Sequence, residues 1–144
     1  MLQTLTNGGA LTTTTSFQDI PNLTFTVSAG GTYVFRAYYI YTGSTTAAQM
    51  QPTMGGTCTA TLVDYRCSIQ TNSSSGGSSS QVHSILSNTG TGATAVTTAS
   101  ANCGVVIDGL IVVSAAGTLT VQAKHVGAAC NVLSGGRYLL EQVA

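Results

Sequence analysis

The chain has 144 residues, of which only 6% are charged, and its four Lys and Arg balance its four Asp and Glu. A typical soluble domain has about 25% charged residues. Nucleic acid and anionic membrane surfaces are excluded as partners, because both need clustered cations, whereas the cations here are scattered over Arg36, Arg66, Lys124 and Arg137. The length predicts one domain, residues 1–144, and the low charge predicts that other proteins cover much of its surface.

Segments in which apolar and polar residues alternate recur along the chain and predict an all-β fold. Residues 23–27 alternate as a half-buried strand does, residues 28–31 make a turn, and residues 32–41 form a long strand. One face of this long strand carries Tyr33, Phe35, Ala37, Tyr39 and Tyr41, and the other carries Val34, Arg36, Tyr38 and Ile40. We expect both faces to be covered except at Arg36.

The second half of the chain predicts three more strands. Residues 105–114 are almost all apolar, as in an inner strand, and residues 118–124 and 137–143 alternate. The Ser- and Gly-rich residues 72–81 are expected to form a polar loop, and residues 88–92 a second one. No segment has an apolar stripe at helical spacing.

Residues 26–32 and 112–118 resemble each other, since both contain Val-Ser-Ala and end in Gly-Thr. Each lies between two predicted strands and is expected to form a similar hairpin corner. Two sheets joined by similar corners make a sandwich, and about eight strands in this length favour a jelly roll.

Nothing in the sequence predicts export or membrane insertion. Residues 1–9 have neither a basic segment nor a continuous apolar one. The longest apolar run is interrupted by Asp108 and is shorter than the ~20 residues that a bilayer requires. The exterior look of the Thr-, Ser- and Gly-rich chain without an export signal fits a virion component made in the host cytoplasm and freed by lysis, and it also fits processing of a longer precursor.

The four cysteines have no spacing typical of a zinc site. Cys58 and Cys67 are close enough in sequence to face each other on a hairpin, and Cys103 and Cys130 would then form a second disulfide. The favoured interpretation, given no export signal, is four buried free thiols.

Catalysis is not expected. His83, His125 and Asp108 are the candidate acid–base residues, but no serine lies in a nucleophile elbow and the four carboxylates are scattered. The sequence also predicts no metal and no cofactor. Removing all three candidates together would test this, because any activity that survives does not depend on them.

The tyrosines at positions 33, 38, 39 and 41 are the single aromatic concentration, and most of them are expected to be core. Arg36, Tyr38, Gln122 and Lys124 alternate away from the more apolar strand faces. We therefore predict them as contacts with other subunits.

An N-terminal strand rich in Thr and Leu, followed by residues 25–35, 107–122 and 134–139, resembles a jelly-roll domain of tailed bacteriophages. That domain occurs in capsid decoration (cement) proteins and in tail-fibre knobs, and it is similar to the trimeric tumour-necrosis-factor and C1q-like folds. Residues 45–95 have no counterpart in the resemblance.

The resemblance implies a homotrimer that binds the major capsid protein on the exterior of a virion assembled in the host cytoplasm, and that stabilises the capsid lattice. Three alternatives remain open. These are a receptor-binding knob at the tail tip, a carbohydrate-binding or C1q-like module, and an enzyme.

Overall fold

The structure is a computed structural model, and it describes residues 1–6, 8–11, 16–43, 49–70, 79–86, 96–97 and 102–144. For Ser79–Leu86 and a few other positions it describes the backbone alone. The described residues contain strands and no helix, which confirms the predicted all-β class. The strands are β1 (Leu2–Thr4), β2 (Gly9–Leu11), β3 (Gln18–Val27), β4 (Thr32–Gly43), β5 (Gln49–Gly55), β6 (Thr59–Gln70), β7 (Ser79–Leu86), β8 (Val96–Thr97), β9 (Asn102–Ala115), β10 (Gly117–Val126), β11 (Cys130–Val132) and β12 (Arg137–Gln142).

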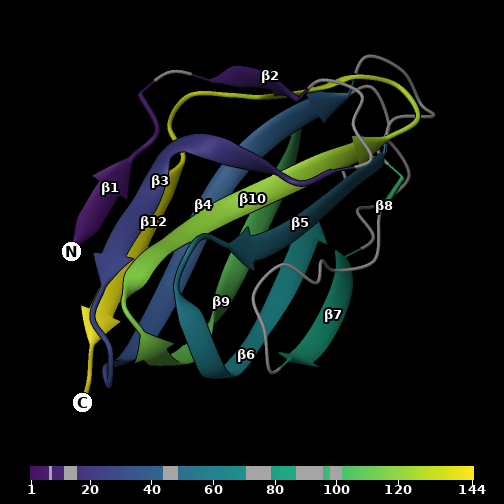
Figure 1. Ribbon diagram of the computed structural model, residues 1–144. Helices are drawn as coiled ribbons and strands as arrows, with labels where there is room; N and C mark the ends of the chain where they lie inside the picture. The colour runs from purple at the N-terminus through teal and green to yellow at the C-terminus, as the bar shows by residue number, and fades with distance from the viewer. Residues whose placement is uncertain (7, 12–15, 44–48, 71–78, 87–95, 98–101) are drawn as a thin grey trace.

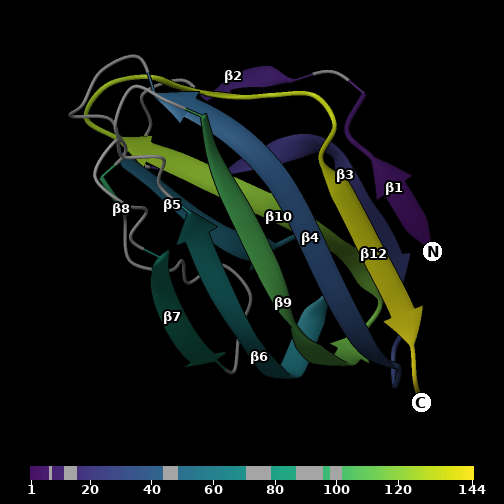
Figure 2. The ribbon, with the colours of Figure 1, turned by 180° about the vertical axis from the view of Figure 1, so that it is seen from behind.

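These strands form two packed sheets, which make a jelly-roll β-sandwich (Figure 1). The large sheet has the order β1-β12-β4-β9-β6-β7, with β11 also paired to β4 and β2 paired to β11, and the small sheet has the order β3-β10-β5-β8. Almost all neighbours are distant in sequence and antiparallel, because the chain repeatedly crosses between layers. Figure 2 shows the large sheet from its outer side, with β9 and β4 at its centre.

Two similar corners join the two sheets, as the internal resemblance predicted, but neither is a hairpin within one sheet. The first links β3 in the small sheet to β4 in the large one, and the second links β9 to β10. The corners bond to each other, because the Gly30 N–H donates to the Val113 carbonyl at 2.8 Å and the Val113 N–H donates to the Gly31 carbonyl at 2.9 Å. Gly30 has a φ of 77°, a backbone conformation that glycine adopts at no steric cost.

The core lies between the sheets and takes alternate residues from every long strand. On β4 the buried set contains Tyr33, Phe35, Ala37, Tyr39 and Tyr41, as predicted. The expectation that its other face is covered as well is wrong, since the side chain of Tyr38 is 41% exposed there. The described residues form two layers, so the outer face of the large sheet has no third layer to cover it.

The sequence-based strand boundaries were short or incomplete. β3 begins at Gln18 rather than at residue 23, because an irregular stretch around Asn22, with a φ of 61°, hides the alternation. Residues 79–81, predicted as loop, begin β7, since Ser can pair in a sheet where the neighbouring strand supplies the ladder. The loops expected at 72–78 and 88–92 lie outside the described residues.

Candidate interaction surface

Charged side chains gather on one face of this charge-poor chain. Of the eight charged residues, six lie on the outer face of the large sheet, where they alternate with buried residues along β4, β6, β9 and β12. They are Arg36, Asp64, Arg66, Asp108, Arg137 and Glu141. Three are positive and three are negative, so this face carries both signs in equal number.

A row of alternating charge crosses three strands at the centre of the face. Arg36 on β4 and Arg66 on β6 both pair in register with Asp108 on β9, which lies between them. The Nε of Arg66 donates to both carboxylate oxygens of Asp108, at 2.8 and 3.0 Å. Within the described part of the chain, Arg36 makes no hydrogen bond or ion pair and is exposed.

We expect the Arg66–Asp108 ion pair to contribute little to stability. Its side chains are 53% and 30% exposed, and exposed pairs typically contribute less than about 1 kcal/mol. Arg66→Ala should therefore lower the free energy of unfolding by less than about 1 kcal/mol in urea denaturation. A loss of several kcal/mol would mean that this pair is a main stabilising contact.

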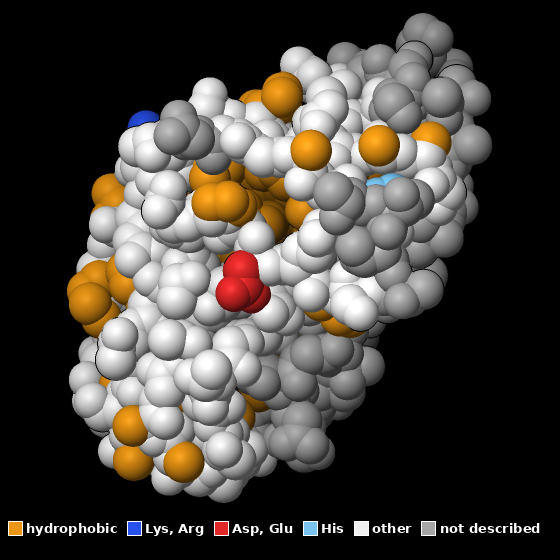
Figure 3. Space-filling model, turned by 45° about the horizontal axis from the view of Figure 1, so that its top comes forward, with side chains coloured by type: hydrophobic (Ala, Val, Ile, Leu, Met, Phe, Trp, Pro, Cys, Tyr) orange, Lys and Arg blue, Asp and Glu red, His pale blue; other side chains and the backbone are white. Residues whose placement is uncertain are grey.

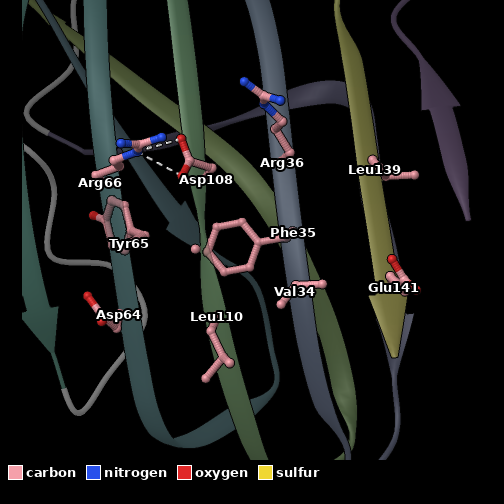
Figure 4. A pocket seen from close by; sticks show the side chains of 11 residues that line it. Val34, Phe35, Arg36, Asp64, Tyr65, Arg66, Asp108, Leu110, Leu139 and Glu141 are labelled. Atoms are coloured by element: carbon pink, nitrogen blue, oxygen red, sulfur yellow. Dashed lines mark hydrogen bonds and ion pairs between the residues drawn. The ribbon is translucent and has the colours of Figure 1, made fainter. Parts of the chain in front are cut away.

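A hollow of about 520 Å³ opens beside this row on the same face. Figure 4 shows Arg66, Asp108 and Arg36 along one side of it, with Leu139 beside Arg36, and Asp64 and Glu141 on the other side, with Val34 and Leu110 between them. The hollow therefore offers guanidinium donors, carboxylate acceptors and aliphatic surface together.

Gly109 forms the floor of the hollow at the centre of β9. It lies in register between Phe35 on β4 and Tyr65 on β6, whose rings approach to 6.5 Å beneath it on the core side. Any Cβ at this position would collide with the carbonyl oxygen of Asp64 and with Tyr65. The absence of a side chain at Gly109 thus allows the two rings to approach each other.

The predicted contact residues are divided between opposite faces of the sandwich. Arg36 and Tyr38 lie on the outer face of the large sheet, whereas Gln122 and Lys124 lie on β10 in the small sheet. Gln122 donates from Nε2 to the Oδ1 of Asp19 at 2.6 Å, and the Nζ of Lys124 lies 4.7 Å from the centre of the Phe17 ring. The four residues therefore do not form one surface.

The acid–base candidates do not form a site among the described residues. His125 is 1% exposed and lies in the core, so a substrate cannot reach it. Asp108 is held by Arg66 on the outer face. His83 is described by its backbone alone, opposite Arg66 in the register of β7. No three His, Cys, Asp or Glu side chains among the residues described are placed to hold a metal ion.

All four cysteines are buried thiols. The hairpin suggested for Cys58 and Cys67 is wrong, because both lie along the extended segment that leads into and forms β6. At about 3.3 Å per residue, this segment places them about 30 Å apart. Cys103 and Cys130 are on β9 and β11, on opposite sides of β4. Two strand spacings, about 10 Å, therefore separate them. Burial, with a smaller contribution from Asp108, raises the pKa of the Cys67 thiol to about 12.

Asp64, Arg66, Arg137 and Glu141 belong to this surface but were not predicted as contact residues from the sequence. A signal was present in the alternation of residues 62–69, where Asp64 and Arg66 occupy the positions between buried residues. A second alternation places Arg137, Leu139 and Glu141 on one face of β12. Neither alternation tells which strands become neighbours.

No protein-family model and no curated protein matches the chain. Among solved structures, it is similar to TmCBM61 in complex with beta-1,4-galactotriose, with a TM-score of 0.43, 7% identity, and 72% of this chain and 68% of that chain covered. It is also similar to a CBM4 structure, with a TM-score of 0.32, 12% identity and 94% of each chain covered. A structure of black queen cell virus matches with a TM-score of 0.29 and 11% identity over 100% of this chain and 72% of that chain. Because these TM-scores are below 0.5, the jelly-roll class rests on the topology of the chain itself.

No helix among the described residues is long and apolar enough to span a membrane.

Proposed function

We propose that this protein is a structural component of a virus particle, a capsid decoration protein. In this proposal it is made in the host cytoplasm, binds the major capsid protein on the outer surface of a phage head as a homotrimer, and stabilises the lattice. The observation that supports this proposal is that the surface outside the charged face carries very few charges. Asp19 and Lys124 are the only charged residues there, and the described residues on the face that Figure 3 shows are largely uncharged.

An uncharged exterior favours a protein that is covered by others. A domain with net charge near zero and few charges is poorly protected from association, and the centres of protein interfaces are depleted in charged residues. Large apolar side chains are also exposed, at Met1, Leu2 and Val143 near the two ends of the chain, and at Tyr38, Leu62 and Leu139 on the charged face itself.

In this role the protein would act by linking its own binding to the stability of the assembled lattice. A protein that binds only the assembled lattice stabilises that state more strongly the further its free concentration exceeds its Kd. A trimer that contacts several capsid subunits at once gains avidity from each added contact. No catalytic residue is needed for this role.

The copy number of this protein in purified particles, measured by quantitative mass spectrometry against the major capsid protein, tests the proposal. We expect the number of copies per particle to be close to that of the major capsid protein. Its absence from particles would contradict a virion role altogether.

A receptor-binding protein at the tail tip is the second candidate, and the hollow on the large sheet favours it. Its guanidinium donors and carboxylate acceptors fit a ligand with hydroxyl groups, which both donate and accept. A few copies per particle, together with binding to host cells that Asp64→Ala abolishes, would favour this candidate over decoration.

A further inference from the structure

The outer faces of β4 and β9 match each other position by position. In the register of the two strands, Val34 lies beside Leu110, Arg36 beside Asp108 and Tyr38 beside Val106. Each position of one strand is therefore chemically complementary to its neighbour on the other, apolar with apolar and cation with anion. A surface with this property can pair with a second copy of itself.

We propose that two copies of the chain pack these faces against each other about a twofold axis that runs along the strands, between β4 and β9. The rotation exchanges the two strands, so that Arg36 of each copy lies over Asp108 of the other. Val34 then lies over Leu110, and Tyr38 over Val106. Such an isologous contact uses one patch twice and satisfies both signs of charge.

The hollow provides the space that this contact needs. Asp108 lines the hollow and its side chain is only 30% exposed, whereas Arg36 is exposed and has no partner in the described part of the chain. Arg36 of the other copy therefore has to enter the hollow to reach Asp108. Arg66 leaves room for it, because it binds through Nε alone and a carboxylate has about four acceptor sites.

The rotation pairs four strands, because it exchanges β4 with β9 and β12 with β6. Four strands at about 4.8 Å spacing and seven residues at about 3.3 Å give about 19 Å by 23 Å. This is about 900 Å² in total for both copies, the size of a weak or transient contact. Packed sheets cross at about 30°, so the central pairs stay matched. Asp64 and Glu141, which the rotation brings toward each other, lie on the flanking strands at the solvated rim.

The inference goes beyond the proposed function and does not depend on a capsid partner. A twofold contact makes the number of copies even. It gives two copies if it acts alone, and six if it joins two trimers.

Native mass spectrometry of the full chain, with two charge-reversal variants, tests the contact. We expect two or six copies for the unchanged protein. Arg36→Asp places two carboxylates opposite each other, and Asp108→Arg places two guanidinium groups opposite each other, so each variant alone should weaken the contact by at least about 100-fold and give one or three copies. An equimolar mixture restores both oppositely charged pairs and should return to an even number of copies.

Lys124→Asp is the matched control, because it makes the same charge change on the outer face of the small sheet, and it should leave the even number unchanged. Far-UV circular dichroism should give the same β-sheet spectrum for Arg36→Asp as for the unchanged protein, since Arg36 is exposed, and the thermal midpoint should fall only by the stabilisation that the lost contact supplied. If that variant fails to fold, Arg36→Gln replaces it, because it removes the charge without adding repulsion, and the expected loss of association is then smaller.

One or three copies for the unchanged protein would overturn the proposal. A mixture that stays dissociated, or a Lys124→Asp variant that dissociates equally, would also overturn it. The copy number in particles is independent of these results, so this contact and the decoration role can fail separately.

Discussion

Replacing Gly109 with Ala is expected to lower the free energy of unfolding by about 2–3 kcal/mol, the cost of an overpacked core position. The added Cβ would lie 2.5 Å from the Cβ and 2.7 Å from the Cα of Tyr65, closer than real Cβ contacts, and would also collide with the Asp64 carbonyl. These are mostly backbone atoms and cannot turn aside. β6 and β9 must therefore separate at the centre of the large sheet, and the Phe35–Tyr65 contact must open.

Thermal unfolding measures this change, with an expected decrease of the midpoint by roughly 5–10 °C. Gly9→Ala is the matched control, because Gly9 also lies in a strand but its added Cβ would meet only the Pro21 side chain, at an ordinary 3.8 Å. We expect less than about 1 °C of change there. Equal midpoints for the two variants would mean that the close approach of β6 to β9 relaxes without cost.

Stability is expected to fall steeply above pH 9. Burial raises the pKa of Cys67 from 9.0 to about 12, and it also raises the pKa of Cys58 and Cys130 and, well above 10.0, that of Tyr39 and Tyr138. In each case the folded state holds the proton more tightly than the unfolded chain. The resulting stability is fully present below the unfolded pKa and is lost as pH rises through the folded pKa.

Urea denaturation at pH 8 and pH 11 measures this loss, and Cys67 alone should account for about 3 kcal/mol of it. The variant Cys67→Ala serves as the control. It is expected to be less stable at pH 8, because it leaves a cavity, but it should lose about 3 kcal/mol less between the two pH values. If the unchanged protein and the variant lose the same amount, the Cys67 thiol is not protected from ionisation by the fold.

The twofold contact and a ligand in the hollow would compete for the same space. Entry of Arg36 from a second copy fills the hollow, so self-association and binding of a receptor group there would exclude each other. A decoration protein at high local concentration would favour the paired state, and a tail-tip protein present in a few copies would leave the hollow open.

Much of the fold was readable from local pattern. Residues 32–41, 105–114 and 118–124 alternate because a strand exposes successive side chains to opposite sides, and each is the centre of a strand in the structure. The two similar corners also predicted the sandwich. The polar start of β7 was not predicted as strand, because its pairing with β6 depends on the sheet and not on the residues of β7 themselves.

The candidate surface was decided by the tertiary structure. The sequence by itself determined that Arg36 and Tyr38 point away from the core and that charges are few and balanced. It did not determine that Arg66 and Asp108, both far from Arg36 in the sequence, lie in one row with it across three neighbouring strands. Nor did it separate Lys124 and Gln122 onto the opposite layer. Strand order and register arise from contacts between segments far apart in sequence, so a local pattern assigns a residue to a face of its strand but not to its neighbours across the sheet.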